Sequence, residues 1–355
     1  MRVGLSMLTL VPGVVGGSET YARGLARALA RERTLDVTAF VPTLAPDAGE
    51  GLPTEVVDEY RAATSAAGRL RAVLAARTAP AALRLRYRGL DVVHYPLTVP
   101  VPPVLARTAV TLHDVQHRDQ PEHFSRAERE YRRLFYDRSA RQADAVVVPS
   151  TFVRERAVEQ LGLDARRVHV IPHGVDHERF RPGGERREPF LLYPARPWPH
   201  KNHARLLEAL ALLRAHRPEL RLVLTGVGTE RFAGREGVEA RGAVPGEELV
   251  SLYRRAACVV FPSLYEGFGL PPLEAMACGT PVAAARAGSL PEVCGEAAVL
   301  FDPQEPEAIA AAVEEALGRA VELSASGPAH AAGFTWAACA RAHVALYRSL
   351  GAPTT

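Results

Sequence analysis

Short runs of apolar residues alternate with amphipathic helical patterns along the whole chain, and this alternation constrains the fold more than any other feature. The runs predict strands at 2–8, 35–41, 91–95, 108–113, 144–149 and 168–172, and again at 190–194, 220–225, 237–241, 257–261 and 281–285. Because these runs are apolar throughout, they indicate parallel strands that helices cover on both faces of the sheet.

Helical patterns fall between most of the predicted strands, at 18–32, 64–86, 125–142, 150–161, 202–216, 246–256, 270–278, 305–318 and 335–350. In the helix at 202–216, four leucines fall on one face at the spacing of an α-helix. We therefore predict an α/β protein that is built from doubly wound parallel sheets.

The chain has 355 residues, which is more than one hydrophobic core usually supports, so two domains are expected. A segment rich in Gly, Pro and charge interrupts the alternation at 173–188. We predict a first Rossmann-like domain at 1–172, a hinge at 173–188 and a second Rossmann-like domain at 189–335.

Composition excludes several classes of protein. A net charge of +3 without interleaved aromatic residues argues against a nucleic-acid partner. The four cysteines lie far apart and have neither metal-ligand spacing nor the pattern of a disulfide framework. No apolar run reaches the roughly 18 residues that a membrane span requires. The N-terminus, with its glycines, reads as strand, loop and helix instead of a signal peptide. We expect a cytoplasmic protein with reduced thiols.

Lys201 is the only lysine among 43 Lys and Arg residues, and it follows the predicted strand at 190–194 together with Arg196. Lysine is a compact point charge, whereas arginine presents a wide planar fork. Two cations in a strand-to-helix loop are suited to clamp a diphosphate and to stabilise it as a leaving group. The alternative interpretation is ordinary surface charge, which is common for an arginine and less so for the lone lysine.

A second loop, at 262–270, leads from the strand at 257–261 into a helix that begins with two prolines. Proline is tolerated in the first turn because its missing N–H would be unpaired there. Gly267 and Gly269 allow backbone N–H groups to approach a ligand closely, and a helix N-terminus binds anions. Glu266 and Glu274 flank this loop and are more suited to bind hydroxyl groups, unless they are only helix-start acids.

The segment E-G-F-G-L-P-P-L-E, with its acids at 266 and 274, resembles the E-x7-E signature of retaining glycosyltransferases of family 4. The resemblance extends through R-x4-K at 196–201 and "HD" at 113–114. It also covers "GGSETYARGLARAL", "VVPSTFVRE", "VIPHGVD", "GAVPGEELVSLYRRA" and "GSLPEV". These motifs span nearly the whole chain in the order of the family. The details are most similar to bacterial enzymes of surface-polysaccharide or natural-product biosynthesis, several of them mannosyltransferases.

The resemblance implies the GT-B fold, in which two Rossmann-like domains face each other across a cleft and the final helix, 336–355, returns to the first domain. It implies that Glu274 binds the ribose of the donor, and that Glu266 and the backbone of Phe268, Gly269 and Leu270 hold the donor sugar and phosphate. Arg196 and Lys201 would neutralise the diphosphate, and the backbone near Val244 would face the base. Gly16, Gly17 and His113 would approach the phosphates, the acceptor and the reacting centre.

The expected reaction is the retaining transfer of a hexose from a nucleoside diphosphate sugar, with GDP-mannose as the first choice and UDP- or dTDP-sugars behind it. The leaving diphosphate would be stabilised by cations and amides, so no metal and no cofactor is expected. The acceptor is a hydroxyl of a glycan, a lipid-linked sugar or a small natural product. Arginines recurring at 61–88 and 126–141 are compatible with a peripheral contact with the inner membrane face, but in an arginine-rich sequence a solvated helix face is the favoured explanation.

Three alternatives share part of this pattern. A sugar-nucleotide epimerase or a phosphorylase would have the same fold, and a sugar-nucleotide-binding protein would need no catalytic groups. An NAD-dependent dehydrogenase is disfavoured because neither half has G-x-G-x-x-G after its first strand. One departure from the family is that Asn202 and His203 follow the lysine, where many relatives have glycine.

Overall fold

The computed structural model describes residues 1–14, 16–77 and 81–352. The chain forms two compact units, of which the N-terminal unit comprises Met1–Gly174 with Trp336–Thr355 and the C-terminal unit comprises Val175–Thr335. Most of the 173–188 segment, which the sequence predicts as a hinge, therefore belongs to the C-terminal unit.

The N-terminal unit contains a sheet of seven parallel strands in the order β3-β2-β1-β4-β5-β6-β7. The strands are β1 (Arg2–Ser6), β2 (Asp36–Pro42), β3 (Thr54–Val57), β4 (Val92–Tyr95), β5 (Arg107–Thr111), β6 (Ala145–Val148) and β7 (Val168–Val170). The order reverses between β1 and β4, so the loops that leave β1, β4 and β5 meet at one edge of the sheet.

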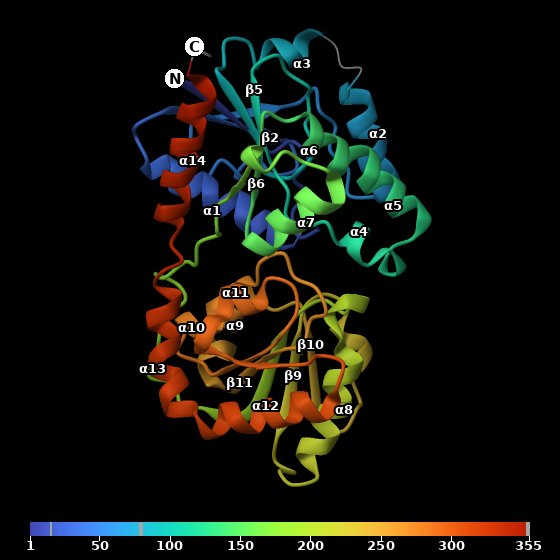
Figure 1. The fold of residues 1–355 in the computed structure, drawn as a ribbon, viewed down its shortest axis with the longest axis vertical. Helices are drawn as coiled ribbons and strands as arrows, with labels where there is room; N and C mark the ends of the chain where they lie inside the picture. The colour runs from blue at the N-terminus through green and yellow to red at the C-terminus, as the bar shows by residue number, and fades with distance from the viewer. Residues whose placement is uncertain (15, 78–80, 353–355) are drawn as a thin grey trace. The chain divides into compact units, whose positions relative to one another are not determined.

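Helices cover both faces of this sheet (Figure 1). One face packs against α1 (Gly17–Arg31) and α14 (Trp336–Gly351), and the other packs against α2 (Ala66–Arg77) and α7 (Thr151–Leu161). Further elements of this unit are α3 (Ala81–Leu85), α4 (Gln116–Asp119), α5 (Arg126–Arg132), a π-helical turn (Arg133–Asp137) and α6 (Arg138–Gln142). The alternation of side chains along the strands supplies both apolar faces.

Helix α14, at the far end of the sequence, lies beside α1 in the N-terminal unit (Figure 1). Gly24 of α1 makes room for Trp336, since a Cβ at this glycine would lie 2.4 Å from Cζ2 of the indole. A buried chain of hydrogen bonds also ties α14 to the sheet. It joins Tyr347 to His94 (2.7 Å), His94 to Thr111 (2.8 Å), Thr111 to Tyr21 (2.9 Å) and Tyr21 to His343 (3.0 Å).

The donor and acceptor roles in this series of hydrogen bonds follow from one further bond of His343. Its Nδ1 donates to the carbonyl oxygen of Cys339 at 2.8 Å. Nε2 of the same ring must then accept from the hydroxyl of Tyr21, which accepts in turn from Thr111. Thr111 accepts from Nε2 of His94, and Nδ1 of His94 accepts from the hydroxyl of Tyr347. Every group is neutral in this arrangement, and burial lowers the pKa of both histidines, that of His343 to about 4.

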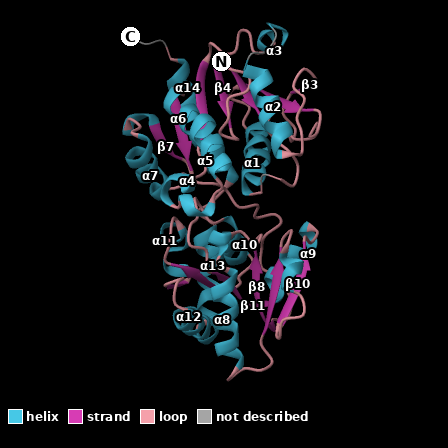
Figure 2. Cartoon of the chain, turned by 90° about the vertical axis from the view of Figure 1, so that its right-hand side faces the viewer, coloured by secondary structure: helices cyan, strands magenta, loops and turns pink. Residues whose placement is uncertain are grey.

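The C-terminal unit contains six parallel strands in the order β10-β9-β8-β11-β12-β13. They are β8 (Glu188–Pro194), β9 (Arg221–Thr225), β10 (Val238–Gly242), β11 (Ala256–Phe261), β12 (Val282–Ala285) and β13 (Val299–Phe301). Helices α8 (His203–Arg214), α9 (Gly246–Arg255), α10 (Leu270–Ala277), α11 (Leu290–Cys294), α12 (Pro306–Gly318) and α13 (Ala320–Ala331) surround the sheet (Figure 2). Among the described residues, no helix is long and apolar enough to cross a membrane.

The predicted α/β architecture with parallel sheets is confirmed, but several elements were not predicted. Strands β3 and β13 have only four and three residues, and helices α4 and α11 have only four and five, which is too few for a periodic pattern. Helix α13 carries Pro328, which conceals its helical character. The helix predicted at 64–86 corresponds to α2 (Ala66–Arg77) and α3 (Ala81–Leu85). Residues 78–80 lie outside the described residues.

Candidate functional site

Strands β8 and β11 are neighbours at the point where the strand order of the C-terminal sheet reverses. Open α/β sheets bind ligands outside the carboxyl ends of their strands at such a point. The loop after β8 carries Arg196 and Lys201, and the loop after β11 carries Glu266. The topology therefore explains why two segments about 65 residues apart in sequence come together.

Lys201 and Glu266 form an ion pair in which Nζ lies 2.5 Å from Oε1, and each side chain is only 14% exposed. The ammonium also lies 5.5 Å from the ring centroid of Phe261 at the end of β11. An ammonium carries three N–H donors, so pairing with one carboxylate oxygen does not exhaust its capacity to bind an anion. The sequence prediction assigned both residues to the donor site, but it did not foresee that they bind each other.

Backbone hydrogen bonds hold the two loops together around this pair. The hydroxyl of Tyr193, on β8, donates to the carbonyl oxygen of Lys201 at 2.7 Å. The N–H of Leu264, after β11, donates to the carbonyl oxygen of His200 at 2.7 Å. The lysine is consequently presented by backbone that is fixed on both sides.

Asn202 follows the lysine and adopts a left-handed backbone with a φ of 57°. Asparagine tolerates this conformation better than most residues. Its side-chain amide donates to the carbonyl oxygens of Pro262 (3.2 Å) and Pro303 (2.6 Å), which a glycine could not do. The departure from the family pattern at this position therefore adds a connection between the loops.

Arg196 lies on the same loop, with its guanidinium carbon 5.7 Å from the ring centroid of Trp198. The backbone of this loop passes close to Gly226, where a Cβ would lie 3.0 Å from the carbonyl carbon of Ala195. Gly226 also has a φ of 122°, so glycine is required there for two reasons. The tight approach fixes the start of the loop that carries both predicted cations.

Helix α10 begins directly after the loop that carries Glu266, with Gly269 at its N-cap. This glycine has a φ of 119°, and a Cβ would lie 2.9 Å from Cδ2 of Leu290. Phe268 is buried, with its ring 5.9 Å from that of Phe334. Leu270 and the two prolines after it form the first turn, so the N–H groups of Gly269 and Leu270 lie at the start of the helix.

The motif "GSLPEV" supports this loop from behind. Ser289 donates from its hydroxyl to the carbonyl oxygen of Phe268 (2.6 Å) and from its N–H to that of Glu266 (3.1 Å). A Cβ at Gly288 would lie 2.7 Å from the backbone nitrogen of Glu266, so only glycine fits there. The motif thus shapes the loop that carries Glu266.

Glu274 lies on α10 and is half-buried, and its Oε2 accepts a hydrogen bond of 2.9 Å from the hydroxyl of Tyr253 on α9. Burial raises the pKa of the Glu274 carboxyl to about 7, although the bond from Tyr253 and the charge of Arg179 act in the opposite direction. Burial and the charge of Glu274 raise the pKa of Tyr253 well above 10, so this phenol remains a donor.

The loop between β10 and α9 carries Val244, which is half-buried and packs against the core of the C-terminal unit. Gly246 follows at the start of α9, and a Cβ there would lie 1.8 Å from Nη2 of Arg179. The glycine therefore makes room for a guanidinium beside the loop for which the resemblance implies contact with the base.

In the N-terminal unit, the loop after β1 leads into α1 through Gly16 and Gly17. Gly16 has a φ of 56°, and nothing lies within 4 Å of a Cβ placed on either glycine. The N–H of Gly13 donates to Oε2 of Glu19 in the first turn of α1 at 2.8 Å. Among the described residues, the space beside both glycines is therefore open, and their contact with a substrate stays a prediction.

His113 follows β5 in the same unit, and its Nε2 donates to the carbonyl oxygen of Pro96 at 2.8 Å. The other ring nitrogen, Nδ1, is then the acceptor of the neutral tautomer. Burial lowers the pKa of His113 below 6.5, although the Pro96 carbonyl and the Asp114 carboxylate oppose this effect. The ring of Tyr21 packs edge-on against it at 5.1 Å. His113 is thus an oriented, neutral hydrogen-bond acceptor.

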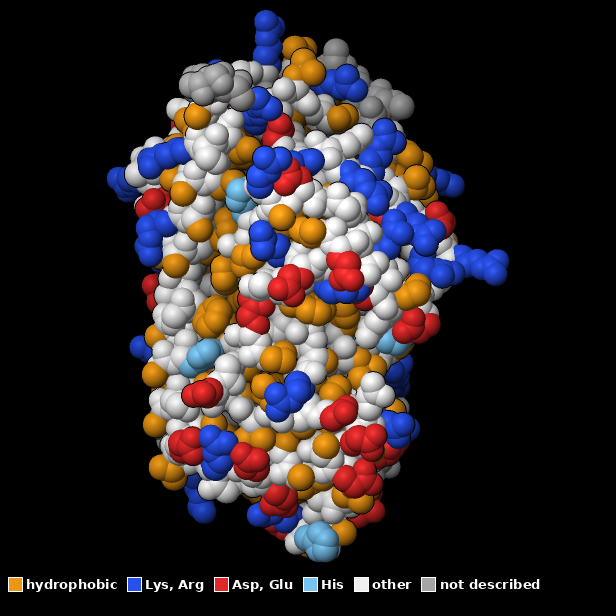
Figure 3. Space-filling view, viewed as in Figure 1, with side chains coloured by type: hydrophobic (Ala, Val, Ile, Leu, Met, Phe, Trp, Pro, Cys, Tyr) orange, Lys and Arg blue, Asp and Glu red, His pale blue; other side chains and the backbone are white. Residues whose placement is uncertain are grey.

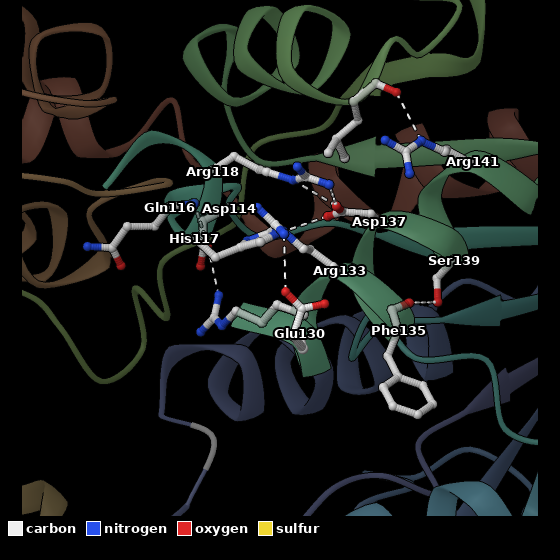
Figure 4. A network of polar contacts seen from close by, with 12 residues as sticks. Asp114, Gln116, His117, Arg118, Glu130, Arg133, Phe135, Asp137, Ser139 and Arg141 are labelled. Carbon is white, nitrogen blue, oxygen red and sulfur yellow. Dashed lines mark hydrogen bonds and ion pairs between the residues drawn. The ribbon is translucent and has the colours of Figure 1, made fainter. Parts of the chain in front are cut away.

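The loop after β5 is anchored by carboxylates (Figure 4). Asp114 accepts from Arg132 of α5 at 3.1 Å. Asp137, which is fully buried at the end of the π-helical turn, accepts from Nε2 of His117 (2.7 Å) and from Nε of Arg118 (2.8 Å). Because π-helical turns re-aim side chains within a helix, this turn points Asp137 at α4.

The predicted site residues thus fall into two groups. Arg196, Lys201, Glu266, Phe268, Gly269 and Leu270 lie at one edge of the C-terminal sheet, with Glu274 and Val244 on the adjoining α10 and β10–α9 loop. Gly16, Gly17 and His113 belong to the N-terminal unit. That the two groups act on one substrate stays a prediction.

Sequence reasoning did not identify Tyr253, Arg179 and Asp137. A tyrosine in an amphipathic helix is expected to be a residue of the hydrophobic core, and an arginine in a charged segment is expected to lie on the surface. Asp137 had a weak signal, because it is the only acid in the arginine-rich stretch 131–142.

The described residues contain no group of three or more His, Cys, Asp or Glu that could hold a metal ion. All four cysteines are buried free thiols, and burial raises the pKa of each to about 12.

Comparisons with known proteins match both units. The family model "Glycosyltransferase Family 4" matches residues 15–179, and "Glycosyl transferases group 1" matches residues 175–325. The O-antigen chain mannosyltransferase B of Escherichia coli is 30% identical, with 70% of this chain and 72% of that protein covered. The MMP alpha-(1->4)-mannosyltransferase of Mycolicibacterium hassiacum is 35% identical over 59% of this chain and 55% of that protein. A D-inositol 3-phosphate glycosyltransferase of Corynebacterium urealyticum is 31% identical over 95% of this chain and 92% of that protein.

Solved structures match the fold along nearly the whole chain. The sucrose-phosphate synthase of Thermosynechococcus elongatus has a TM-score of 0.78 at 22% identity, with 100% of both chains covered. HepE of Anabaena in complex with UDP and glucose has a TM-score of 0.75 at 20% identity, with 98% of this chain and 100% of that chain covered. These likenesses show the GT-B fold.

Proposed function

The chain belongs to glycosyltransferase family 4, and we propose that it transfers a hexose from a nucleoside diphosphate sugar to a hydroxyl group with retention of the anomeric configuration. Its activity as a glycosyltransferase follows from the family. The donor, the stereochemistry and the independence of a metal ion are the parts that we propose.

The observation that carries the proposal is the Lys201–Glu266 pair at the edge of the sheet, beside the N-terminus of α10. A site with a compact cation, a second cation on the same loop and the backbone N–H groups of a helix N-terminus is suited to a diphosphate. The carboxylate beside the lysine is suited to sugar hydroxyl groups. A donor with both parts, a diphosphate and a sugar, therefore matches the charges of the site.

In the proposed reaction, the bond between the anomeric carbon and the phosphate oxygen breaks while negative charge builds on the leaving diphosphate. The acceptor oxygen bonds to the anomeric carbon on the same face, and its proton passes to the leaving phosphate. Lys201, Arg196 and the N–H groups of Gly269 and Leu270 would stabilise the developing charge. Because protein groups supply the positive charge, the proposed mechanism requires no metal ion.

Two carboxylate roles are open to Glu266, a nucleophile or a ligand of sugar hydroxyls. The ammonium of Lys201 neutralises its Oε1, which weakens it as a nucleophile. We therefore favour the hydroxyl-binding role. His113, whose Nδ1 is an acceptor, would orient a hydroxyl group, and its lowered pKa makes it a weaker base than a free histidine.

For the nucleotide, Glu274 would accept hydrogen bonds from the ribose and the loop at Val244 would lie against the base. GDP-mannose is the first donor to test, because two of the relatives are mannosyltransferases by name. UDP- and dTDP-sugars are the next, and the HepE structure contains UDP.

The acceptor would be a hydroxyl of a glycan, a lipid-linked sugar or a small natural product, and a membrane contact would suit a lipid-linked one. Four leucines of the N-terminal unit, at 70, 74, 85 and 134, are between 37% and 58% exposed. Figure 3 shows blue side chains, which in this unit are all arginines, over the region of α2 and α5. Apolar and basic side chains together favour an anionic membrane surface. Sedimentation with anionic vesicles tests this contact.

The test of the proposed function is incubation with GDP-mannose, UDP-glucose and dTDP-glucose, in the presence of EDTA and a panel of hydroxyl acceptors. We expect one donor to release its nucleoside diphosphate only with an acceptor and to give a product of unchanged anomeric configuration by NMR. A changed sugar nucleotide without acceptor would identify an epimerase instead. An inverted product would contradict retention, and loss of transfer in EDTA would contradict metal independence.

A further inference from the structure

Tyr253 is a fully buried tyrosine that the proposed mechanism does not yet use. Its hydroxyl donates to Oε2 of Glu274 at 2.9 Å. Its carbonyl oxygen accepts from the hydroxyl of Thr280 at 2.6 Å, and its ring packs edge-on against Phe180 with centroids 5.9 Å apart. The ring is therefore held by packing, while the hydroxyl has a specific partner in the candidate nucleotide site.

Arg179 approaches the same site from the segment that precedes β8. Its guanidinium lies against Gly246, the residue whose missing side chain makes room for it, and over the ring of Phe180 at 5.1 Å. The positive charge of Arg179 favours the ionised form of Glu274. Arg179 itself is exposed, so its position is not explained by burial in the core.

We propose that Tyr253 and Arg179 are positioning residues for nucleotide recognition: Tyr253 holds Glu274 as an oriented carboxylate that accepts hydrogen bonds from the ribose, and Arg179 places a positive charge beside the same site. This inference rests on the proposed function, since it names how that site reads the sugar of the nucleotide. The bond to Oε2 fixes the plane of the carboxylate and leaves Oε1 to the ribose diol.

The charges around Glu274 show why such support matters. Burial raises the pKa of this carboxyl, and the charge of Asp176 raises it further. Cys278, on the same helix, is neutral because its pKa is about 12. The hydrogen bond from Tyr253 and the charge of Arg179 act in the opposite direction and lower the pKa of Glu274. Without them, a larger fraction of the carboxyl would be protonated at neutral pH, and the protonated form offers less acceptor capacity to ribose hydroxyls.

The test compares Tyr253→Phe with the wild-type protein, and uses Tyr87→Phe as a matched control. Tyr87 is also a buried tyrosine with a 2.9 Å hydrogen bond, to Ser6 in the N-terminal unit. Calorimetry at pH 8 would measure the affinities for GDP and 2′-deoxy-GDP, and for UDP and 2′-deoxy-UDP. The ratio of the affinities for a nucleotide and for its 2′-deoxy form isolates recognition of the ribose, because general damage to the fold lowers both affinities equally.

We expect the wild type to prefer one ribonucleotide over its deoxy form by about tenfold, as for a charge-assisted hydrogen bond. Tyr253→Phe should reduce this ratio at least threefold with little change for the deoxy form, and Tyr87→Phe should leave it unchanged. Arg179→Gln, a change at an exposed position, should reduce the ratio as well and serves as the test if Tyr253→Phe does not fold.

Two results would overturn the inference, and they are distinguishable. If the wild type binds none of these four nucleotides and does not bind dTDP or ADP either, the proposed function fails and the inference fails with it. The other result is that the wild type prefers the ribonucleotide, but Tyr253→Phe and Arg179→Gln have the same affinity ratio as the wild type. The two residues are then only structural, whether or not the substitutions lower both affinities equally, and the proposed function stands.

Discussion

Lys201 and Glu266 bind each other in the free protein, with Nζ 2.5 Å from Oε1. A diphosphate that enters this site meets a lysine whose charge is already partly neutralised. The ion pair therefore holds the lysine in place at the cost of some affinity for a bare diphosphate. A sugar nucleotide offsets this cost because its hydroxyl groups can bind the carboxylate. Lysine suits this arrangement better than arginine, because a compact ammonium can contact a carboxylate and a phosphate at once.

Replacement of Glu266 by glutamine should separate binding from catalysis. Glu266→Gln removes a negative charge beside the diphosphate site, so affinity for a nucleoside diphosphate should rise severalfold. Transfer should fall by about a hundredfold or more, because the donor sugar loses a charged hydrogen-bond acceptor. Calorimetry with the diphosphate and initial-rate assays with the sugar nucleotide measure the two effects. Equal losses of both would contradict the account.

The pH dependence of donor binding should follow Glu274. Its pKa is about 7 in the folded protein, and ribose hydroxyls need its ionised form. The affinity for a sugar nucleotide should therefore be constant above pH 8 and fall about tenfold per unit well below pH 7. A sugar nucleotide is the right probe because its diphosphate is esterified on both sides and does not titrate in this range. Glu274→Gln should bind weakly and without this dependence.

The same group makes a prediction for stability. Its folded pKa is raised above the usual 4.5, so the folded protein binds a proton between pH 7 and 4.5 that the unfolded chain does not. Glu274 should then stabilise the fold as pH falls through this window and destabilise it above. The melting temperature of Glu274→Gln relative to wild type should be higher at pH 8 than at pH 5. A constant difference would argue against the raised pKa.

A methyl group at Gly269 should disturb the start of α10. Gly269→Ala places a Cβ at a φ of 119° and 2.9 Å from Leu290. We expect a stability loss of about 1–3 kcal/mol and a loss of donor affinity of about tenfold or more, because the N–H groups would move. Gly318→Ala is the control, since nothing lies within 4 Å of its Cβ at the end of α12. Similar effects of both changes would exclude a special role of Gly269.

Asn202 should contribute to stability through its backbone and its side chain. Asn202→Ala loses two hydrogen bonds and places alanine at a φ of 57°, whereas Asn202→Gly loses only the bonds. We expect a decrease of about 2–4 kcal/mol for alanine and about 1 kcal/mol less for glycine. Urea unfolding of the three proteins measures this. A glycine variant less stable than the alanine variant would contradict the assignment.

The sequence was sufficient to predict the α/β fold, because short apolar strands that alternate with amphipathic helices leave a recurring pattern along the chain. It also placed Lys201 and Glu266 in loops at the carboxyl edge of the sheet, where the structure has them. Their mutual ion pair was not predictable, because a motif states which residues are present and not which ones bind each other. Tyr253 and Asp137 were missed for a similar reason, since buried hydrogen bonds between distant segments leave no periodicity. The common role of the residues of the two units stays a prediction.

The central claim is that Lys201 binds the diphosphate of the donor. Its most direct test is calorimetric titration of GDP, UDP, dTDP and ADP, with EDTA present, into the wild type, Lys201→Ala and Lys201→Arg. We predict that one diphosphate binds the wild type with micromolar affinity and that both variants lose about tenfold or more, or about 1.4 kcal/mol. If no diphosphate binds, or if the variants bind as tightly as the wild type, Lys201 does not clamp a diphosphate and the proposed donor site is wrong.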